Sequence, residues 1–253
     1  MHAARWLSAA ILLLPAVSAQ VRYTGLPADA VVIEQEPVPE SAHPNRLLVL
    51  WMKSPQRNPR DGTPEDNAYT CPEVTRGHYY HGPTAVSLVD TAVRHVINSV
   101  DIEPLYGDSL DIPYFIEAGH YYTVPGKLVH NEGKPKLLAL RDYNGDGKAL
   151  EAAFFDAESC MGLTTALIGY SEKQDKVIQY SVELISEADG KRSRKTEQWA
   201  EYLFSKKPVQ PGYWKYEIDR RGHGGTLDSY EVRYDAAKER FTGTVVSTAG
   251  DLK

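Results

Sequence analysis

The sequence predicts an all-β protein built from antiparallel hairpins, with few helices. From about residue 46 onward, Val, Ile, Thr and Tyr alternate with polar residues over short runs, and turn-forming residues separate these runs. No segment has the apolar period of a convincing amphipathic helix. Such hairpins are typical of a small β-propeller and of a β-sandwich, and we expect one of these two architectures.

A short internal repeat is compatible with the propeller-like alternative. The tetrapeptide Gly-His-Tyr-Tyr occurs at residues 77–80 and again at 119–122, so the two copies lie 42 residues apart. A four-stranded propeller blade repeats every 40–45 residues or so. A sandwich assembled from the same hairpins competes closely with this interpretation.

The first 19 residues have the features of a secretory signal peptide. An arginine precedes an apolar run over residues 9–17, and Ser18 and Ala19 offer a cleavage site before Gln20. The apolar run is too short to span a bilayer, and no later run is long enough to do so. We therefore expect a secreted or periplasmic protein without a transmembrane anchor.

The mature chain is expected to consist of an arm and one domain. Four prolines interrupt residues 20–45, which predicts an extended N-terminal arm. Residues 46–253 are long enough for a single all-β domain with a sizeable core. The net charge of −6 argues against nucleic acid as a partner, because phosphates require a basic face.

Four hairpins are predicted within this domain from paired β-branched runs around turn residues. They span residues 85–102, 136–156, 165–184 and 228–247, with turns at 90–92, 142–148, 171–175 and 235–238. One short helix is expected over residues 156–163, capped by Asp156. The basic run 191–195 follows an Asp-Gly turn signal and is expected to form a solvated hairpin tip.

The heptapeptide Asp142–Lys148 is the clearest indication of a ligand. Asp142, Asn144 and Asp146 place an oxygen-bearing side chain at every second position, and Gly147 follows the third. This is the spacing with which one tight loop coordinates a hard cation such as Ca²⁺. A plain hairpin turn is the alternative, because Asn-Gly and Asp-Gly both tolerate positive φ.

Residues 140–156 (LRDYNGDGKALEAAFFD) also resemble the calcium loops of FG-GAP/VCBS-type repeats in secreted β-propellers, where D-x-[DN]-G-D-G joins two strands. The resemblance implies a structural Ca²⁺, and adhesion or carbohydrate-related binding. It implies that Asp142, Asn144 and Asp146 supply side-chain ligands and that Lys148 supplies its carbonyl.

The match departs from these families after Lys148. The repeats usually have an acid at the ninth loop position, which is Leu150 here, and the bidentate glutamate of an EF-hand would fall on Ala153. Glu151 or Asp156 completes the coordination shell only if the backbone bulges after Lys148. We therefore expect weak calcium affinity, which extracellular modules tolerate.

Other candidate chemistry is less specific. Cys71 and Cys160 are the only cysteines, and in an oxidising compartment such a pair suggests one disulfide; two unpaired, buried thiols are the alternative. Asp108, Asp111 and Glu117 lie among tyrosines, as in a glycan-acting hydrolase, but a glycosidase requires two acids at a fixed spatial separation. Solvated acids at strand edges are the simpler interpretation.

The leading hypothesis is a secreted, non-enzymatic all-β protein with one structural Ca²⁺. Its 16 tyrosines suit the recognition of a carbohydrate or an extracellular protein, although high β-propensity also accounts for them. The alternatives are an extracellular glycan-acting hydrolase using the carboxylates near Asp108–Glu117, and a structural protein associated with the cell envelope.

Overall fold

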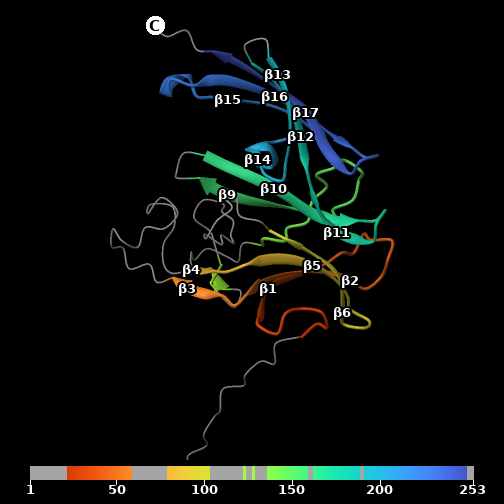
Figure 1. The fold of residues 1–253 in the computed structure, drawn as a ribbon. Coiled ribbons are helices and arrows are strands. Elements are labelled where there is room, and N and C mark those ends of the chain that lie inside the picture. Colours follow the sequence, from red (N-terminus) through yellow and green to blue (C-terminus); the bar gives the residue numbers. More distant parts are fainter. Residues whose placement is uncertain are drawn as a thin grey trace, which may run out of the picture.

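The structure is a computed structural model that describes residues 22–58, 79–102, 122–123, 127–128, 136–158, 162–188 and 191–249. The all-β prediction is confirmed: three sheets are stacked on one another, drawn in Figure 1 from orange at the bottom to blue at the top. Within the described residues, the helical elements are two short 3-10 turns, η1 (Leu203–Ser205) and η2 (Arg221–His223).

The lower sheet has the strand order β1-β2-β5-β6, with every neighbouring pair antiparallel. Its strands are β1 (Ala30–Pro37), β2 (Arg46–Lys53), β5 (Thr84–Asp90) and β6 (His95–Asp101). The hairpin predicted over residues 85–102 is confirmed, because β5 and β6 pair from Ala85↔Asp101 to Asp90↔His95.

The segment predicted as an extended N-terminal arm, residues 20–45, includes an edge strand of the lower sheet. Strand β1 pairs with β2 from Ala30↔Lys53 to Pro37↔Leu47, and the side chain of Tyr23 is buried against this sheet. The prolines are compatible with this arrangement, because β1 is an edge strand and Pro37 is its last residue.

The middle sheet is built around β10, which pairs with β9 on one side and with β11 and β14 on the other. Its strands are β9 (Glu151–Glu158), β10 (Gly162–Ser171), β11 (Lys176–Tyr180) and β14 (Ala200–Glu201). The predicted turn at residues 171–175 is confirmed by the pair Ser171↔Lys176. The helix predicted over residues 156–163 is wrong, because β9 continues to Glu158 and pairs there with Gly162.

The upper sheet has the order β13-β12-β17-β16-β15 and includes one parallel pair, β12 with β17. Its strands are β12 (Val182–Ala188), β13 (Lys191–Glu197), β15 (Tyr213–Asp219), β16 (Thr226–Asp235) and β17 (Arg240–Ala249). The hairpin predicted over residues 228–247 is confirmed by β16 and β17. The basic run 191–195 lies in strand β13 itself, not at a hairpin tip.

Two further strand pairs complete the described structure. They are β3 (Gln56–Asn58) with β4 (Tyr79–His81), and β7 (Tyr122–Thr123) with β8 (Lys127–Leu128). Most of the repeated Gly-His-Tyr-Tyr segments lies outside the described residues.

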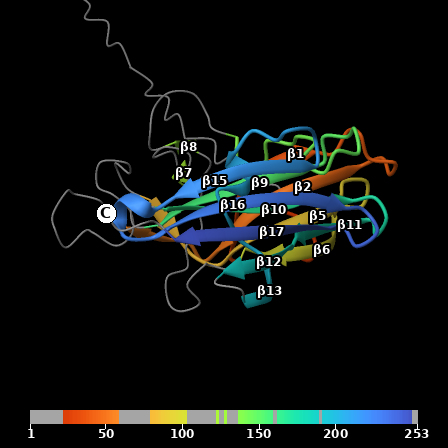
Figure 2. The same cartoon turned by 90° about the horizontal axis from the view of Figure 1, so that it is seen from above.

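Two apolar cores hold the three sheets together. The core between the lower and middle sheets contains Leu48 and Leu50 of β2 and Ile168 of β10, whereas Leu167 of β10 faces the core below the upper sheet. Neighbouring residues of a strand thus serve opposite cores, as the two-residue period requires. Seen from above, the long strands of the stacked sheets run roughly in one direction, which is the aligned packing of a sandwich (Figure 2).

One end of the stack is fastened by polar contacts between the sheets. The guanidinium of Arg46 in the lower sheet lies 2.8 Å from the carboxylate of Asp90 and 2.7 Å from that of Asp175, which follows β10. The hydrogen bond from Arg46 lowers the pKa of Asp175 to about 2. In the turn before Asp175, Gln174 donates a hydrogen bond to Glu239 of the upper sheet. The acidic loop lies at this end.

Candidate functional site

The acidic loop is closed at its base by a single backbone bridge. The N–H of Arg141 donates to the carbonyl of Glu151 at 2.8 Å, and the N–H of Glu151 returns a bond of 3.2 Å. The hairpin predicted over residues 136–156 is therefore reduced to this bridge, with the loop 142–148 beyond it and β9 starting at Glu151.

The loop folds around the carboxylate of Asp142. Its Oδ1 accepts the N–H of Gly145 at 2.6 Å, and its Oδ2 accepts the N–H of Gly147 at 3.0 Å. The two glycines have φ of +82° and +89°, in the left-handed region that glycine adopts without a Cβ clash. The sharp turn predicted at Gly147 is thus present.

Asn144 and Asp146 continue the same pattern. Asn144 Oδ1 accepts the N–H of Asp146 at 2.8 Å, and Asp146 Oδ1 accepts the N–H of Lys148 at 2.8 Å. Asn144 Nδ2 also donates to Asp146 Oδ2 at 3.1 Å. A carboxylate oxygen has two lone pairs, so each of these oxygens can accept one hydrogen bond and still coordinate a cation.

Glu151 fastens the loop from below. Its side chain is fully buried, and its carboxyl accepts the N–H of Tyr143 at 3.0 Å, Asn144 Nδ2 at 2.9 Å and the Tyr180 hydroxyl at 3.4 Å. Burial raises the pKa of Glu151 to about 8, the Tyr143 N–H opposes this shift, and the negative charges of Asp146 and Asp142 add to it. Glu151 is therefore attached to the loop by the hydrogen bonds that it accepts from Tyr143 and Asn144.

Of the other two predicted ligands, Lys148 belongs to the loop and Asp156 does not. The Lys148 carbonyl belongs to the loop and accepts the N–H of Leu150 at 3.1 Å. Asp156 lies in β9, five residues beyond Glu151, and its backbone pairs with that of Thr164 in β10. At about 3.3 Å per residue, the backbone of Asp156 is about 16 Å along the strand from that of Glu151, too far for these two acids to bind one ion.

The donor set of the loop is accordingly small. It consists of two carboxylates, the amide oxygen of Asn144 and the carbonyl of Lys148. In the part of the chain that the structure describes, no three Asp, Glu, His or Cys side chains gather closely enough to hold a metal ion among themselves. A cation at this loop would therefore require water for the rest of its coordination shell.

The loop and the residue after it contact connecting segments of all three sheets. The N–H of Ala149 donates to the carboxylate of Glu40, in the segment before β2, and the Lys148 ammonium pairs with Glu172 after β10. The turn before β15 packs on the loop backbone: a Cβ on Gly212 would lie 2.4 Å from the Asn144 carbonyl oxygen. Sequence reasoning missed these contacts, because nothing local to residues 40, 172 or 212 indicates them.

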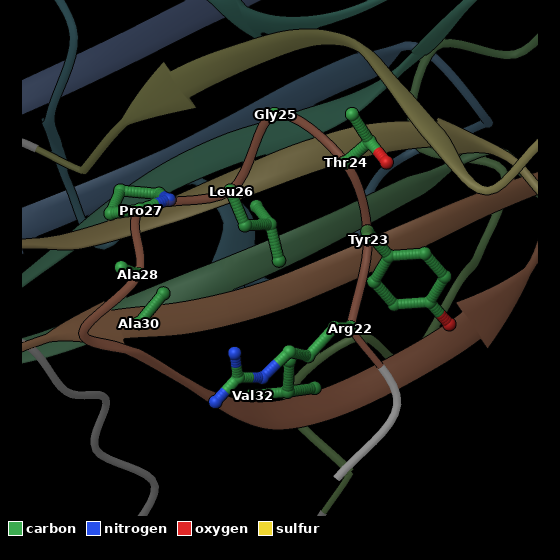
Figure 3. A pocket seen from close by; sticks show the side chains of 9 residues that line it. All are labelled: Arg22, Tyr23, Thr24, Gly25, Leu26, Pro27, Ala28, Ala30 and Val32. Atoms are coloured by element: carbon green, nitrogen blue, oxygen red, sulfur yellow. The ribbon is translucent and has the colours of Figure 1, made fainter.

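A second concave feature lies under the lower sheet. Residues 22–32 curl into a ring around a hollow of about 290 Å³, into which Leu26 points (Figure 3). Tyr23, Pro27 and Val32 supply further apolar lining, and Arg22 is its charged residue. This described lining contains no carboxylate, histidine or cysteine, so it offers no acid–base or nucleophilic pair.

The remaining candidates lie outside the described residues. These are the cysteines Cys71 and Cys160 and the carboxylates Asp108, Asp111 and Glu117. Among the helices of the described part, none has the length and apolarity to cross a membrane.

Comparisons with protein-family models, with curated proteins and with solved structures found no match for this chain.

Proposed function

We propose that this chain is an exported, non-enzymatic all-β binding protein in which loop 142–148 holds one Ca²⁺. One observation carries the proposal: Asp142, Asn144 and Asp146 share a loop that is already folded around Asp142 and that lies against connecting segments of all three sheets. An ion in this loop would stiffen the junction of the sheets. Its role would be structural.

The chemistry of the donors suits a hard cation. Carboxylate, amide and carbonyl oxygens are the ligands that Ca²⁺ takes, and water completes shells that the protein leaves open. Asp142, Asn144, Asp146 and the Lys148 carbonyl would be the protein ligands, whereas Glu151 would position Asn144 from below. With so few carboxylates, we expect a Kd of about 0.1–1 mM, the range of extracellular modules.

Among the described residues, the acids Glu201 and Asp228 are arranged for an ion pair rather than for hydrolysis. Glu201 and Asp228 come close to each other only through Arg220, whose guanidinium lies 2.6 Å from the first and 2.7 Å from the second. Two acids neutralised in this way are not arranged as a proton donor and a nucleophile. The hollow under the lower sheet contains no acid.

The outer face of the upper sheet would be the surface that meets a carbohydrate or protein partner. Figure 1 shows no further sheet above it. Tyr213 presents its ring there beneath the guanidinium of Arg233, with 3.8 Å from the guanidinium carbon to the ring centroid. Tyrosine rings combine an apolar face with a polar tip, which suits sugar and peptide surfaces.

Calcium is expected to raise the thermal stability of the wild type. For a Kd of about 1 mM, 10 mM Ca²⁺ would contribute about 1.4 kcal/mol, because a ligand that binds only the folded state stabilises it by RT ln(1 + [L]/Kd). In a domain of this size, that is a rise in Tm of about 3–5 °C. Differential scanning fluorimetry in 10 mM Ca²⁺ and in EGTA measures it.

The double variant Asp142→Asn/Asp146→Asn should lose this calcium-dependent shift, whatever its melting temperature in EGTA. Asp219→Asn is the matched control, since Asp219 is an exposed aspartate that pairs with Arg221 away from the loop. It should retain the full shift. Equal melting temperatures of the wild type in Ca²⁺ and EGTA would contradict the calcium proposal.

A further inference from the structure

Strand β13 is an exposed, basic edge of the upper sheet. It lies at the end of the strand order, and its residues Lys191–Thr196 are all exposed. Four of them are cations: Lys191, Arg192, Arg194 and Lys195. Seven consecutive residues pair with β12, from Val182↔Glu197 to Ala188↔Lys191, without a shift in register. The edge is therefore regular as well as charged.

The four cations are divided between the two faces of the sheet. Lys195 lies opposite Leu184, which packs on the core below the upper sheet, so Lys195 and Lys191 share that face. Arg192 and Arg194 lie on the other face, because successive residues of a strand alternate. Two ion pairs form within this hairpin, Arg192 with Glu187 and Lys195 with Glu197. Among the described residues, Lys191 and Arg194 form none.

Three other edge strands of the lower and upper sheets, β1, β6 and β15, have local irregularities or contacts. Edge strand β1 has a register shift between Val32 and Glu34 and ends in a proline. At the start of β15, Val209 and Gln210 form backbone hydrogen bonds with Tyr213. At the start of β6, His95 is bridged by Thr24. These features disfavour strand addition at the positions where they occur, whereas β13 carries only charge within the described residues.

The positive charge of β13 disfavours the addition of a basic strand but favours the addition of an acidic one. A second copy of β13 would place cation against cation, which is unfavourable for directly opposed residues. An acidic strand would place carboxylates against the same cations and would use the edge backbone N–H and C=O groups that have no partner among the described residues. The edge therefore discriminates against self-association and in favour of an acidic partner.

We propose that β13 is a docking edge for an acidic, extended peptide segment of a partner protein, which adds to the upper sheet beside β13. This inference deepens the binding role proposed above and rests on it for the class of activity. It does not involve the acidic loop, because the loop contacts the turn before β15, at the edge of the upper sheet opposite to β13. Peptide binding should therefore be the same in Ca²⁺ and in EGTA.

The test uses the full chain and a fluorescein-labelled peptide of alternating threonine and glutamate, followed by fluorescence anisotropy. Saturable binding is expected, and it should weaken at least tenfold in Arg192→Glu/Arg194→Glu. The control variant Arg221→Glu/Lys238→Glu removes two exposed cations from turns of the same sheet and should bind like the wild type. A peptide of the same charge with proline in place of threonine should not bind, because it cannot form a strand ladder.

The proposal would be overturned by no binding of the threonine–glutamate peptide, by equal binding of the proline peptide, or by equal binding of the peptide to both double variants. Heparin is included as a competitor. Binding of heparin to β13 at the affinity of the peptide would make the edge a general polyanion surface and would also overturn it. Peptide binding without a calcium-dependent melting shift would instead contradict only the calcium part of the proposed function.

Discussion

Replacing Glu151 with alanine is expected to lower the free energy of unfolding by about 3 kcal/mol. The substitution removes the acceptor of the Tyr143 N–H, the Asn144 amide and the Tyr180 hydroxyl at a fully buried position. A buried donor left without a partner costs about 1–3 kcal/mol, and the lost side-chain volume adds a cavity penalty. Urea denaturation at fixed pH measures the change.

Glu151→Gln is the matched control, because it keeps the volume and one acceptor oxygen but cannot ionise. The pKa of Glu151 is about 8 in the folded protein, above its value of about 4.3 when unfolded. Its contribution to stability is therefore complete below about pH 4.3 and is lost as the pH rises through 8. The wild type should lose stability across this window relative to Glu151→Gln. Parallel pH profiles of the two proteins would contradict the buried, proton-binding role of Glu151.

Gly212→Ala is expected to destabilise the protein by about 3 kcal/mol. Gly212 has a φ of +74°, and an added Cβ would lie 2.4 Å from the carbonyl oxygen of Asn144. The left-handed conformation alone costs a non-glycine residue about 1–2 kcal/mol, and backbone displacement adds to it. The unfolding free energy from urea denaturation measures the loss.

Gly147→Ala separates these two costs. Gly147 has a φ of +89°, but an added Cβ there would meet no atom within 4 Å. It should therefore show only the conformational cost, about 1–2 kcal/mol. Equal destabilisation by both substitutions would mean that the turn at Gly212 does not seat against the loop.

Local patterns of the sequence predicted much of this fold. The hairpins over residues 85–102, 165–184 and 228–247 were predictable because alternating β-branched runs flank turn residues within one short segment. The three stacked sheets follow the sandwich alternative. The repeat at residues 77–80 and 119–122 gave no reliable guide to the arrangement, since a tetrapeptide carries little information about packing.

Pairings between distant segments were not predictable in the same way. Prolines suggested that residues 20–45 lie outside the domain, but β1 pairs along the edge strand position that tolerates Pro37. The aspartate at residue 156 resembles a helix cap, yet pairing with β10 keeps this segment extended. The parallel pairing of β12 with β17 joins residues far apart in the chain and leaves no local signal.

In the candidate site, too, the local pattern was predictable from the sequence and the contacts made in three dimensions were not. The alternation of Asp142, Asn144 and Asp146 is a local pattern, and the structure gathers these residues with Glu151 in one hydrogen-bonded loop. Asp156 does not join them, because a straight strand carries it away from the loop. That Glu151 faces the donors of the loop could not be read from spacing, since it depends on the buried position of β9 beneath Asn144.

Direct calcium binding tests the central claim, that the loop 142–148 holds one ion. Isothermal titration calorimetry of metal-free protein with Ca²⁺ is expected to show one ion per chain, with a Kd of about 0.1–1 mM. Asp142→Asn/Asp146→Asn should show no saturable binding, whereas Asp219→Asn should bind like the wild type. Absence of saturable binding by the wild type, or unchanged binding by the double loop variant, would contradict the claim.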